Sequence, residues 1–398
     1  MADHDAETQT GRAAAIERLL VVTIDRLPAW ILPAYGATWV SMPALDALAG
    51  RGVVFDGLVA TGADPRQTVT DLLGGAGTPV AAAVGGPAAT VVDHAAYADL
   101  VAGAEARCVE PRAAVLPADA EDRTNLARLF DAATGVVAAG RHALVWCHAA
   151  SLGVAWDAPA EFRAAYIDPD DPPPPAGAAV PDLAVTADTD PDLVVGLRHV
   201  FAGQLTLLDR RLAPLLEAAG AGWTILVAGT RGMPLGLHGR LGPGPLAPYG
   251  ELVRLPAILV DGRGRMAAQR FGGLATPADI GATLLDLAGA RGTPADPGHA
   301  RSLAGLFAHG SATPRDRVVV TTAEGVAVRT PAWQCVLPTA APRPRLFAMP
   351  DDFFERCDVA DRCPEVVEEL GPLAEAAAAG DLARAWTAGL SPAAAGAD

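Results

Sequence analysis

The chain contains no lysine, and all 30 of its basic side chains are arginines. Aromatic residues make up only 5% of the sequence, and 46 acidic residues give a formal net charge of -16. Nucleic acid and anionic membrane surfaces are therefore poor partners, because binding to phosphates depends on clustered basic residues. A site that needs a compact ammonium group is also excluded, since arginine presents a planar fork instead.

Cysteines and long apolar runs are also scarce. The five cysteines form no CxxC pair, which excludes a zinc knuckle. Cys357 and Cys363 are close enough in sequence to pair, but reduced thiols are expected in a cytosolic chain. The apolar run at residues 19–24 is far too short to span a membrane. Residues 1–18 are polar and lack the pattern of a secretion signal, so we expect a flexible N-terminus and a cytoplasmic protein.

With 398 residues, of which 51% are hydrophobic, the chain can bury a large core. Continuous β-rich runs alternate with helical patterns, which predicts an α/β fold with a large, mainly parallel sheet sandwiched by helices. The expected strands are residues 19–24, 53–55, 142–148, 223–228 and 255–260. The expected helices are residues 44–49, 68–73, 124–133, 192–219 and 277–289.

The pattern changes near residue 312, where short strands separated by turns replace the alternation of strands and helices. They predict a small antiparallel sheet, followed by helices at 365–370 and 372–386. We therefore divide the chain into a flexible N-terminus at 1–18, an α/β core at 19–311 and an α+β subdomain at 312–398. Within the core, residues 168–181 include four consecutive prolines and predict an exposed, extended excursion.

The first strand ends on a single aspartate, Asp25, and residues 277–289 read Pro-Ala-Asp-Ile-Gly-Ala-Thr-Leu-Leu-Asp-Leu-Ala-Gly. These segments resemble the sulfatase family of the alkaline phosphatase superfamily, in a divergent bacterial form, and the second is similar to the family's DxxPTLLDLAG helix. Residues 301–303 match its GRSL turn, and residues 328–333 match its xRTxxW hairpin. The segment at 345–360 resembles the family's closing stretch. The similarity covers nearly the whole chain and implies the family's fold.

Active members of this family hold a divalent cation with several carboxylates to polarise the ester oxygen. Here Asp25 keeps the first metal position, but Arg26 replaces the second carboxylate. Thr230 and Arg231 stand where the resemblance places an aspartate and a histidine or asparagine. Arginine is a poor ligand because it is always protonated. We therefore expect no bound metal or other cofactor, and an ion pair between Asp25 and Arg231.

The nucleophile of the family lies in the segment that corresponds to residues 63–75. Alignment on the Asp-Pro-Arg triplet that ends at Arg66 puts Ala63 or Asp64 near the nucleophile position. Counting back from the Leu-Leu-Gly-Gly run favours Thr68 instead. No cysteine lies in this segment, which excludes a formylglycine made from cysteine. We expect Thr68 to cap a helix rather than to attack an ester.

Two histidines lie at plausible site positions. His148 ends a predicted strand, and His238 lies in a segment similar to the family's xxLGEHG, although a lone histidine is more often structural. The family's active-site lysines have no counterpart here. The predicted remnant pocket therefore contains Asp25, Arg26, Arg66, His148, Thr230, Arg231 and His238.

Three functions remain open. The first is a metal-free pseudoenzyme that binds a small anionic or sugar-like ligand, or a protein partner. The second is a sulfuric- or phosphoric-ester hydrolase that uses Thr68 and a reduced site around Asp25. Its Ca, Mg, Mn or Zn ion would need further carboxylates such as Asp64, Asp71 or Asp157. The third is a structural or interaction protein.

Overall fold

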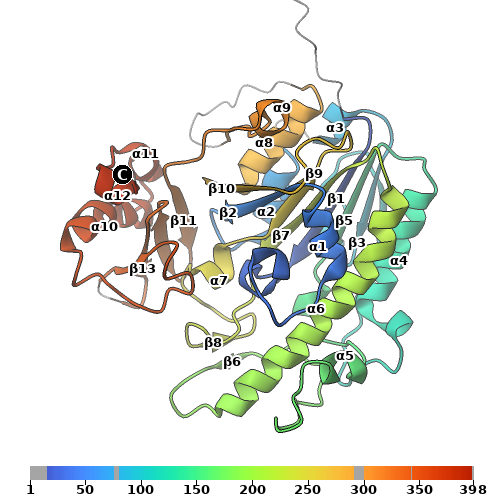
Figure 1. Ribbon diagram of the computed structural model, residues 1–398, viewed down its shortest axis with the longest axis horizontal. Helices are drawn as coiled ribbons and strands as arrows, with labels where there is room; N and C mark the ends of the chain where they lie inside the picture. The colour runs from blue at the N-terminus through green and yellow to red at the C-terminus, as the bar shows by residue number, and fades with distance from the viewer. Residues whose placement is uncertain (1–15, 76–79, 291–299, 342, 397–398) are drawn as a thin grey trace, which may run out of the picture.

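A single large sheet forms the core of the protein (Figure 1). The computed structural model describes residues 16–75, 80–290, 300–341 and 343–396. The strand order is β10-β2-β9-β7-β1-β5-β3-β4. Neighbouring strands are parallel except at β9, which is antiparallel to both β2 and β7. The strands are β1 Leu19–Asp25, β2 Val53–Leu58, β3 Ala88–Val92, β4 Glu105–Cys108, β5 Leu144–Ala149, β7 Thr224–Arg231, β9 Ala257–Val260 and β10 Gln269–Ala275.

Helices cover both faces of this sheet, which confirms the predicted α/β sandwich. Alternate residues of the fully buried strand β1 enter the two opposite apolar layers, as the period of a strand requires. One layer includes α1 Pro43–Ala49, α4 Asn125–Ala138, α5 Ala160–Ala164 and α6 Pro191–Ala219. The other includes α2 Pro65–Leu72, α3 Val80–Val84, α7 Gly250–Val253, α8 Pro277–Leu287 and α9 Gly305–His309.

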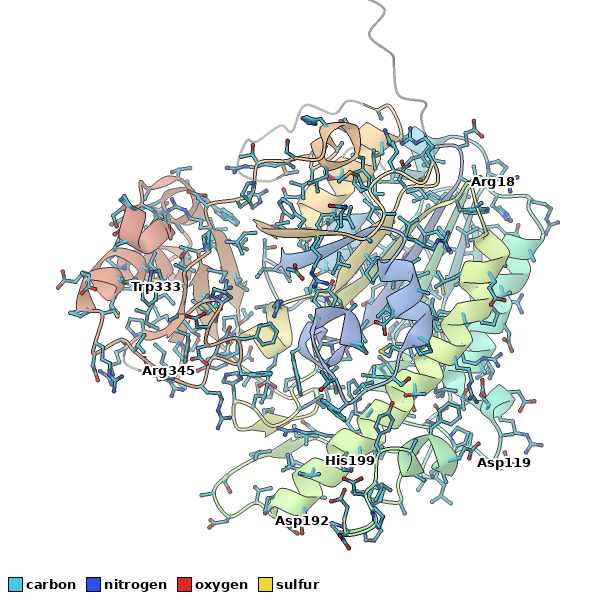
Figure 2. The ribbon with its side chains drawn as sticks, in the orientation of Figure 1. Arg18, Asp119, Asp192, His199, Trp333 and Arg345 are labelled. Carbon is cyan, nitrogen blue, oxygen red and sulfur yellow. The ribbon has the colours of Figure 1, made fainter. Side chains whose placement is uncertain are left out.

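A smaller antiparallel sheet follows, with the order β11-β12-β13-β14. Figure 2 shows Trp333 and Arg345 on this subdomain, far from His199 on α6. The strands are β11 Val318–Thr322, β12 Gly325–Arg329, β13 Trp333–Pro338 and β14 Arg345–Ala348. Its apolar layer also includes residues of the helices α10 Pro364–Ala378, α11 Leu382–Thr387 and α12 Pro392–Ala395.

The terminal helices divide at a different place from the one predicted. α10 runs through Pro372 as one helix, whereas we expected a break between residues 370 and 372. The helix ends near Gly380, whose φ of 87° favours glycine. Pattern alone missed this because a proline often marks a helix boundary, while here apolar burial on both sides of Pro372 holds the helix together.

The N-terminal region and the proline-rich excursion are tied to the core by a few contacts. Residues 1–15 lie outside the described residues, but Ile16 is buried and its backbone N–H donates to the Leu287 carbonyl at 3.0 Å.

Residues 168–181 form no helix or strand apart from one bridge between Ala155 and Ala179. The short pair β6 Leu183–Ala184 and β8 Arg240–Leu241 lies after this excursion.

Two expectations from composition concern the cysteines and the membrane. All five cysteines are free thiols, including Cys357 and Cys363. Among the described residues, no helix is both long enough and apolar enough to cross a membrane.

A buried ion pair joins α8 to the loop that leads into the C-terminal subdomain. Arg315 Nε and Nη2 each donate to Asp279 at 2.6 Å, and both side chains are at most 2% exposed. The same carboxylate accepts the backbone N–H groups of Thr276 and Arg301. Asp279 therefore fixes three separate segments, since a bidentate pair with further hydrogen bonds is strongly oriented.

We predict that Asp279→Asn lowers the free energy of unfolding by about 3 kcal/mol or more, because it removes the carboxylate that forms the bidentate pair with the buried Arg315. Urea denaturation measures this change. Asp286→Asn, on the same helix but only partly buried, is the matched control and should change stability by less than about 0.5 kcal/mol. Equal effects of the two substitutions would contradict the prediction.

Candidate functional site

Strands β1, β5 and β7 lie side by side and parallel, so their carboxyl ends meet at one edge of the sheet. The pairing of β1 with β7 shifts at its end: Ile24 faces Gly229, but Asp25 faces Arg231. Thr230 is therefore the extra residue of a β-bulge, a feature that re-aims side chains at the end of a strand. The bulge sets Arg231 directly opposite Asp25.

The expected ion pair between Asp25 and Arg231 is present. Arg231 Nη2 lies 2.7 Å from Asp25 Oδ2, and Arg231 Nε lies 3.2 Å from Oδ1. Thr230 Oγ1 donates to Oδ1 at 3.3 Å. Asp25 is only 5% exposed. Both oxygens of this carboxylate are thus bound by side chains of the same protein, in the bidentate geometry that arginine favours.

Arg26 adds a second positive charge at this edge. Its Nε lies 3.9 Å from Asp25 Oδ2, and its side chain is largely buried. Burial, and after it the nearby Arg231 charge, lowers the Arg26 pKa to about 10, so the group stays protonated at neutral pH. Its φ of 63° is left-handed, which is uncommon for a residue other than glycine. Two guanidinium groups therefore surround one carboxylate, and these three side chains together have a net positive charge.

The residues at this edge do not fit a divalent cation. A hard cation needs several oxygen ligands, and Asp25 supplies the only carboxylate of the ion-paired cluster. Asp64 caps the start of α2, Asp71 accepts a hydrogen bond from a glutamine along the same helix, and Asp157 accepts the Asn125 backbone N–H at 2.8 Å. Within the described ranges, no group of three or more His, Cys, Asp or Glu side chains is placed to hold a metal ion.

Thr68 does not cap a helix, so that prediction was wrong. Asp64 is the N-cap of α2, because its side chain accepts the Arg66 N–H at 2.9 Å and Pro65 opens the helix. Thr68 therefore lies inside the helix, where it is 4% exposed. Its hydroxyl donates to the Asp64 carbonyl at 3.3 Å, which directs the hydroxyl proton to a carbonyl oxygen.

His148 lies buried beneath the same edge. Its Nδ1 lies 2.9 Å from Thr23 Oγ1, and that oxygen also accepts the Trp146 indole N–H at 2.9 Å. The ring contacts Tyr97, with centroids 4.0 Å apart. Burial lowers the His148 pKa to about 4, so the imidazole is neutral at pH 7. Nε2 has no hydrogen-bond partner among the described residues.

The other two residues of the predicted remnant pocket lie elsewhere. Arg66 turns toward η3 (Ala95–Tyr97) and bonds to the Ala96 carbonyl, with Asp99 Oδ1 at 3.7 Å from its Nη2. His238 stacks on Tyr249, with ring centroids 3.9 Å apart. Among the described residues, neither shows a bond to the ion-paired cluster. The structure thus brings together only Asp25, Arg26, Thr230 and Arg231, with His148 beneath them.

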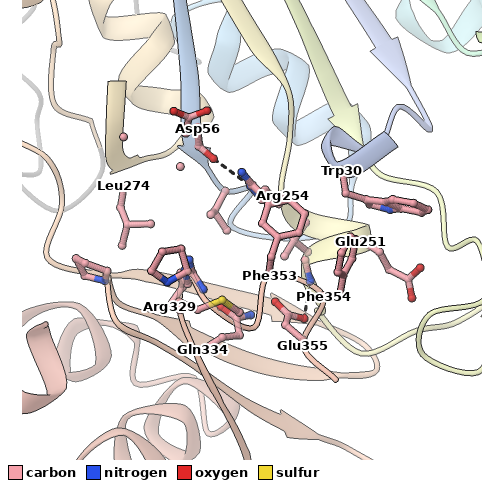
Figure 3. A pocket seen from close by; sticks show the side chains of 18 of the residues that line it. Trp30, Asp56, Glu251, Arg254, Leu274, Arg329, Gln334, Phe353, Phe354 and Glu355 are labelled. Carbon is pink, nitrogen blue, oxygen red and sulfur yellow. Dashed lines mark hydrogen bonds between the residues drawn. The ribbon is translucent and has the colours of Figure 1, made fainter. Parts of the chain in front are cut away.

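A cavity that the sequence did not reveal lies between the core and the C-terminal subdomain (Figure 3). Its volume is about 380 Å³, within the range of small-molecule sites. Arg254, Arg329 and Glu355 contribute charged groups to its lining, and His238 belongs to it as well. One sequence signal could have indicated this cavity. Arg329 is a charged residue at the end of the otherwise apolar strand β12, where burial of a charge is unfavourable without a partner.

Comparisons with known proteins define the class of fold. The phosphonate monoester hydrolase of Agrobacterium radiobacter gives a TM-score of 0.71 at 16% identity, over 89% of this chain and 94% of that chain. That of Silicibacter pomeroyi gives 0.67 at 17% identity, over 90% and 94%. A putative sulfatase from Bacteroides thetaiotaomicron gives 0.69 at 14% identity, over 96% of each. No protein-family model and no curated protein matches the chain.

These similarities extend over most of the chain. At identities below a fifth they concern the fold, and a shared fold does not by itself convey an activity. The protein therefore has the fold of sulfatases and phosphonate monoester hydrolases, as the resemblance predicted.

We predict that Arg231→Gln destabilises the protein by about 2–3 kcal/mol, because the buried Asp25 loses its bidentate partner and keeps only the more distant Arg26 charge. We expect a smaller loss of stability than for a fully buried ion pair, because the Arg231 side chain is 21% exposed. A double-mutant cycle with Asp25→Asn should recover much of the loss. Arg66→Gln, at a more exposed arginine, should change stability little. Simple additivity of the two substitutions would contradict the pairing.

The neutral His148 also predicts a pH dependence of stability. Its pKa is about 4 when folded against an ordinary 6.5, so only the unfolded chain gains this proton as the pH falls from 6.5 to 4. Stability should therefore decrease by roughly 3 kcal/mol through this window. In His148→Gln this part of the decrease should vanish, whereas the exposed control His309→Gln should keep it. Chemical denaturation at several pH values measures the difference.

Proposed function

We propose that this protein is a metal-free sulfatase-fold pseudoenzyme, which binds an anionic or sugar-like ligand instead of hydrolysing an ester. The observation that carries this proposal is the ion pair between Asp25 and Arg231, which takes both oxygens of the one carboxylate at a family metal position. A cation that approached Asp25 would meet two guanidinium groups, Arg26 and Arg231. The charge that a metal supplies in an active relative is supplied here by arginine.

The positions that support chemistry in active relatives also favour binding over hydrolysis. Thr68 is buried, and its hydroxyl is committed to a backbone carbonyl rather than to a general base. His148 is neutral and hydrogen-bonded to Thr23. The chain has no lysine to stabilise a transferred sulfate or phosphate. The net positive charge of Asp25, Arg26 and Arg231 taken together suits an anion better than a cation.

The alternative is hydrolysis of a sulfuric or phosphoric ester with Thr68 as the nucleophile. The similar structures favour it, because they include phosphonate monoester hydrolases and a 2-O GAG sulfatase. This route requires Thr68 to leave its carbonyl and the edge to gather additional oxygen ligands. Neither requirement is met by the arrangement of the described side chains.

Metal analysis and activity assays test the proposal on the full chain. We expect no stoichiometric Ca, Mg, Mn or Zn after dialysis, because a single ion-paired carboxylate holds a hard cation weakly. We also expect no turnover of aryl sulfate, aryl phosphate or aryl phosphonate monoesters above background, with or without added metal. Inductively coupled plasma spectrometry and release of the aryl alcohol give the two measurements.

A matched pair of variants separates hydrolysis by this protein from contamination. Thr68 and Thr70 lie on the same helix, and each hydroxyl donates to the carbonyl four residues earlier. Metal-dependent turnover that Thr68→Val abolishes and Thr70→Val leaves intact would establish the hydrolase alternative. Turnover that survives Thr68→Val would point to a contaminant or to a different nucleophile.

A further inference from the structure

The cavity between the core and the C-terminal subdomain combines apolar surface with charge. Trp30, Phe353 and Phe354 supply aromatic rings, and Leu274 and Met349 supply aliphatic surface. Phe354 packs edge-on against both Trp30 and Phe353. Figure 3 shows these rings on one side and the Arg329, Gln334 and Glu355 side chains below them. A lining of this kind, with a few polar groups amid apolar surface, is typical of a ligand site.

Arg329 lines this cavity with a guanidinium that makes no hydrogen bond or ion pair with the described residues. It projects from the end of β12. Burial lowers the Arg329 pKa to about 10, which leaves the group charged at neutral pH. Glu355 is the acid whose charge favours the protonated Arg329, but no hydrogen bond or ion-pair contact joins the two described side chains. An anion from outside that contacts the guanidinium would therefore stabilise this largely buried charge.

Two other acidic residues of the lining, Asp56 and Glu251, already have partners within the protein. Asp56 is paired with Arg270, with Nε 3.0 Å from Oδ2. Glu251 accepts hydrogen bonds from the backbone N–H groups of Leu235 and His238 and contacts His238 Nδ1 at 2.7 Å.

Arg254 and Glu355 complete the polar lining. Arg254 Nε donates to the Asp56 carbonyl at 3.0 Å, and its guanidinium lies 4.0 Å above the Phe353 ring, which leaves its charge unneutralised. Burial raises the Glu355 pKa to about 7, so this carboxyl is only partly ionised at neutral pH. The guanidinium groups of Arg254 and Arg329 thus line the cavity together with a partly ionised Glu355, which opposes a second negative charge on a ligand.

We infer that this cavity binds a small amphiphilic monoanion, whose single oxyanion contacts Arg329 and whose apolar or aromatic body packs against Trp30, Phe353 and Phe354. A planar guanidinium suits an oxyanion such as a carboxylate, a sulfonate or a sulfate ester. The inference deepens the proposed function, because it gives the anionic ligand a place and a chemical class. It locates that ligand away from the Asp25–Arg231 edge.

A pair of fluorescent probes tests both halves of this inference. 8-Anilinonaphthalene-1-sulfonate has an aromatic body and one sulfonate, whereas N-phenyl-1-naphthylamine has the same body without the charge. We expect the sulfonate to bind at one site per folded chain and more tightly than the neutral amine. Arg329→Gln should weaken the sulfonate about tenfold or more and leave the amine unchanged, since only the sulfonate uses a charge-assisted bond.

Two further variants control the experiment. Arg343→Gln removes an exposed arginine of the same subdomain that pairs with Asp361, and it should alter neither affinity. Phe354→Ala truncates a ring that is 45% exposed, and it should weaken both probes. An Arg329→Gln protein that binds the sulfonate as well as the wild type, or that loses both probes equally with an intact fold, would overturn the inference.

Folding and the two proposals can be judged separately. Circular dichroism and thermal unfolding establish whether each variant is folded. If Arg329→Gln does not fold, the affinities of the wild-type protein for the two probes test the inference. Equal affinities for the two probes overturn it. Tighter binding of the sulfonate that weakens as the salt concentration rises supports it. Ester turnover with bound metal would contradict the proposed function but not the ligand site in this cavity. Sulfonate binding that does not depend on Arg329 would contradict only the inference about the cavity.

Discussion

The ion pair between Asp25 and Arg231 determines what the carboxyl edge of the main sheet can do. At the carboxyl ends of β1 and β7, one guanidinium holds both oxygens of this carboxylate. A fixed cation of this kind neutralises the carboxylate but cannot exchange a water or accept a lone pair from an ester. The proposed function rests on this difference, because arginine supplies positive charge without the Lewis acidity of a metal ion.

The geometry of this pair depends on the backbone as much as on the two side chains. Without the bulge at Thr230, the register between β1 and β7 would place Thr230, not Arg231, opposite Asp25. Arg26 then follows in a left-handed conformation, which turns the chain sharply as it leaves the strand. The backbone of both strands therefore contributes to the geometry of the ion pair.

Much of the fold could be predicted from the sequence because buried strands and the segments similar to sulfatases are local signals. Strands β1, β5 and β7 follow continuous apolar runs, and the salt bridge of Asp25 followed from the identity of the residue at position 231. Thr68 was misjudged because an Asp-Pro pair started its helix four residues earlier.

The remaining errors concern contacts between residues that are distant in sequence. His238 and Arg329 lie 91 positions apart, and only the docking of the C-terminal subdomain brings them to one cavity. Arg66 shares a segment with Thr68 but turns to the opposite side of its helix to reach Ala96. Motif spacing indicates which residues share a strand or a helix, but it does not indicate which loops from different layers meet.

Strand β4 at the outer end of the main sheet has a consequence for the behaviour of the protein in concentrated solution. The strand is only Glu105–Cys108, all of its residues are exposed, and it carries charges of both signs at Glu105 and Arg107. A short, charged border strand is a poor template for strands from another molecule, which would have to bury these charges. Among the described residues β4 is the last strand at this end of the sheet, so its charges oppose uncontrolled self-association there.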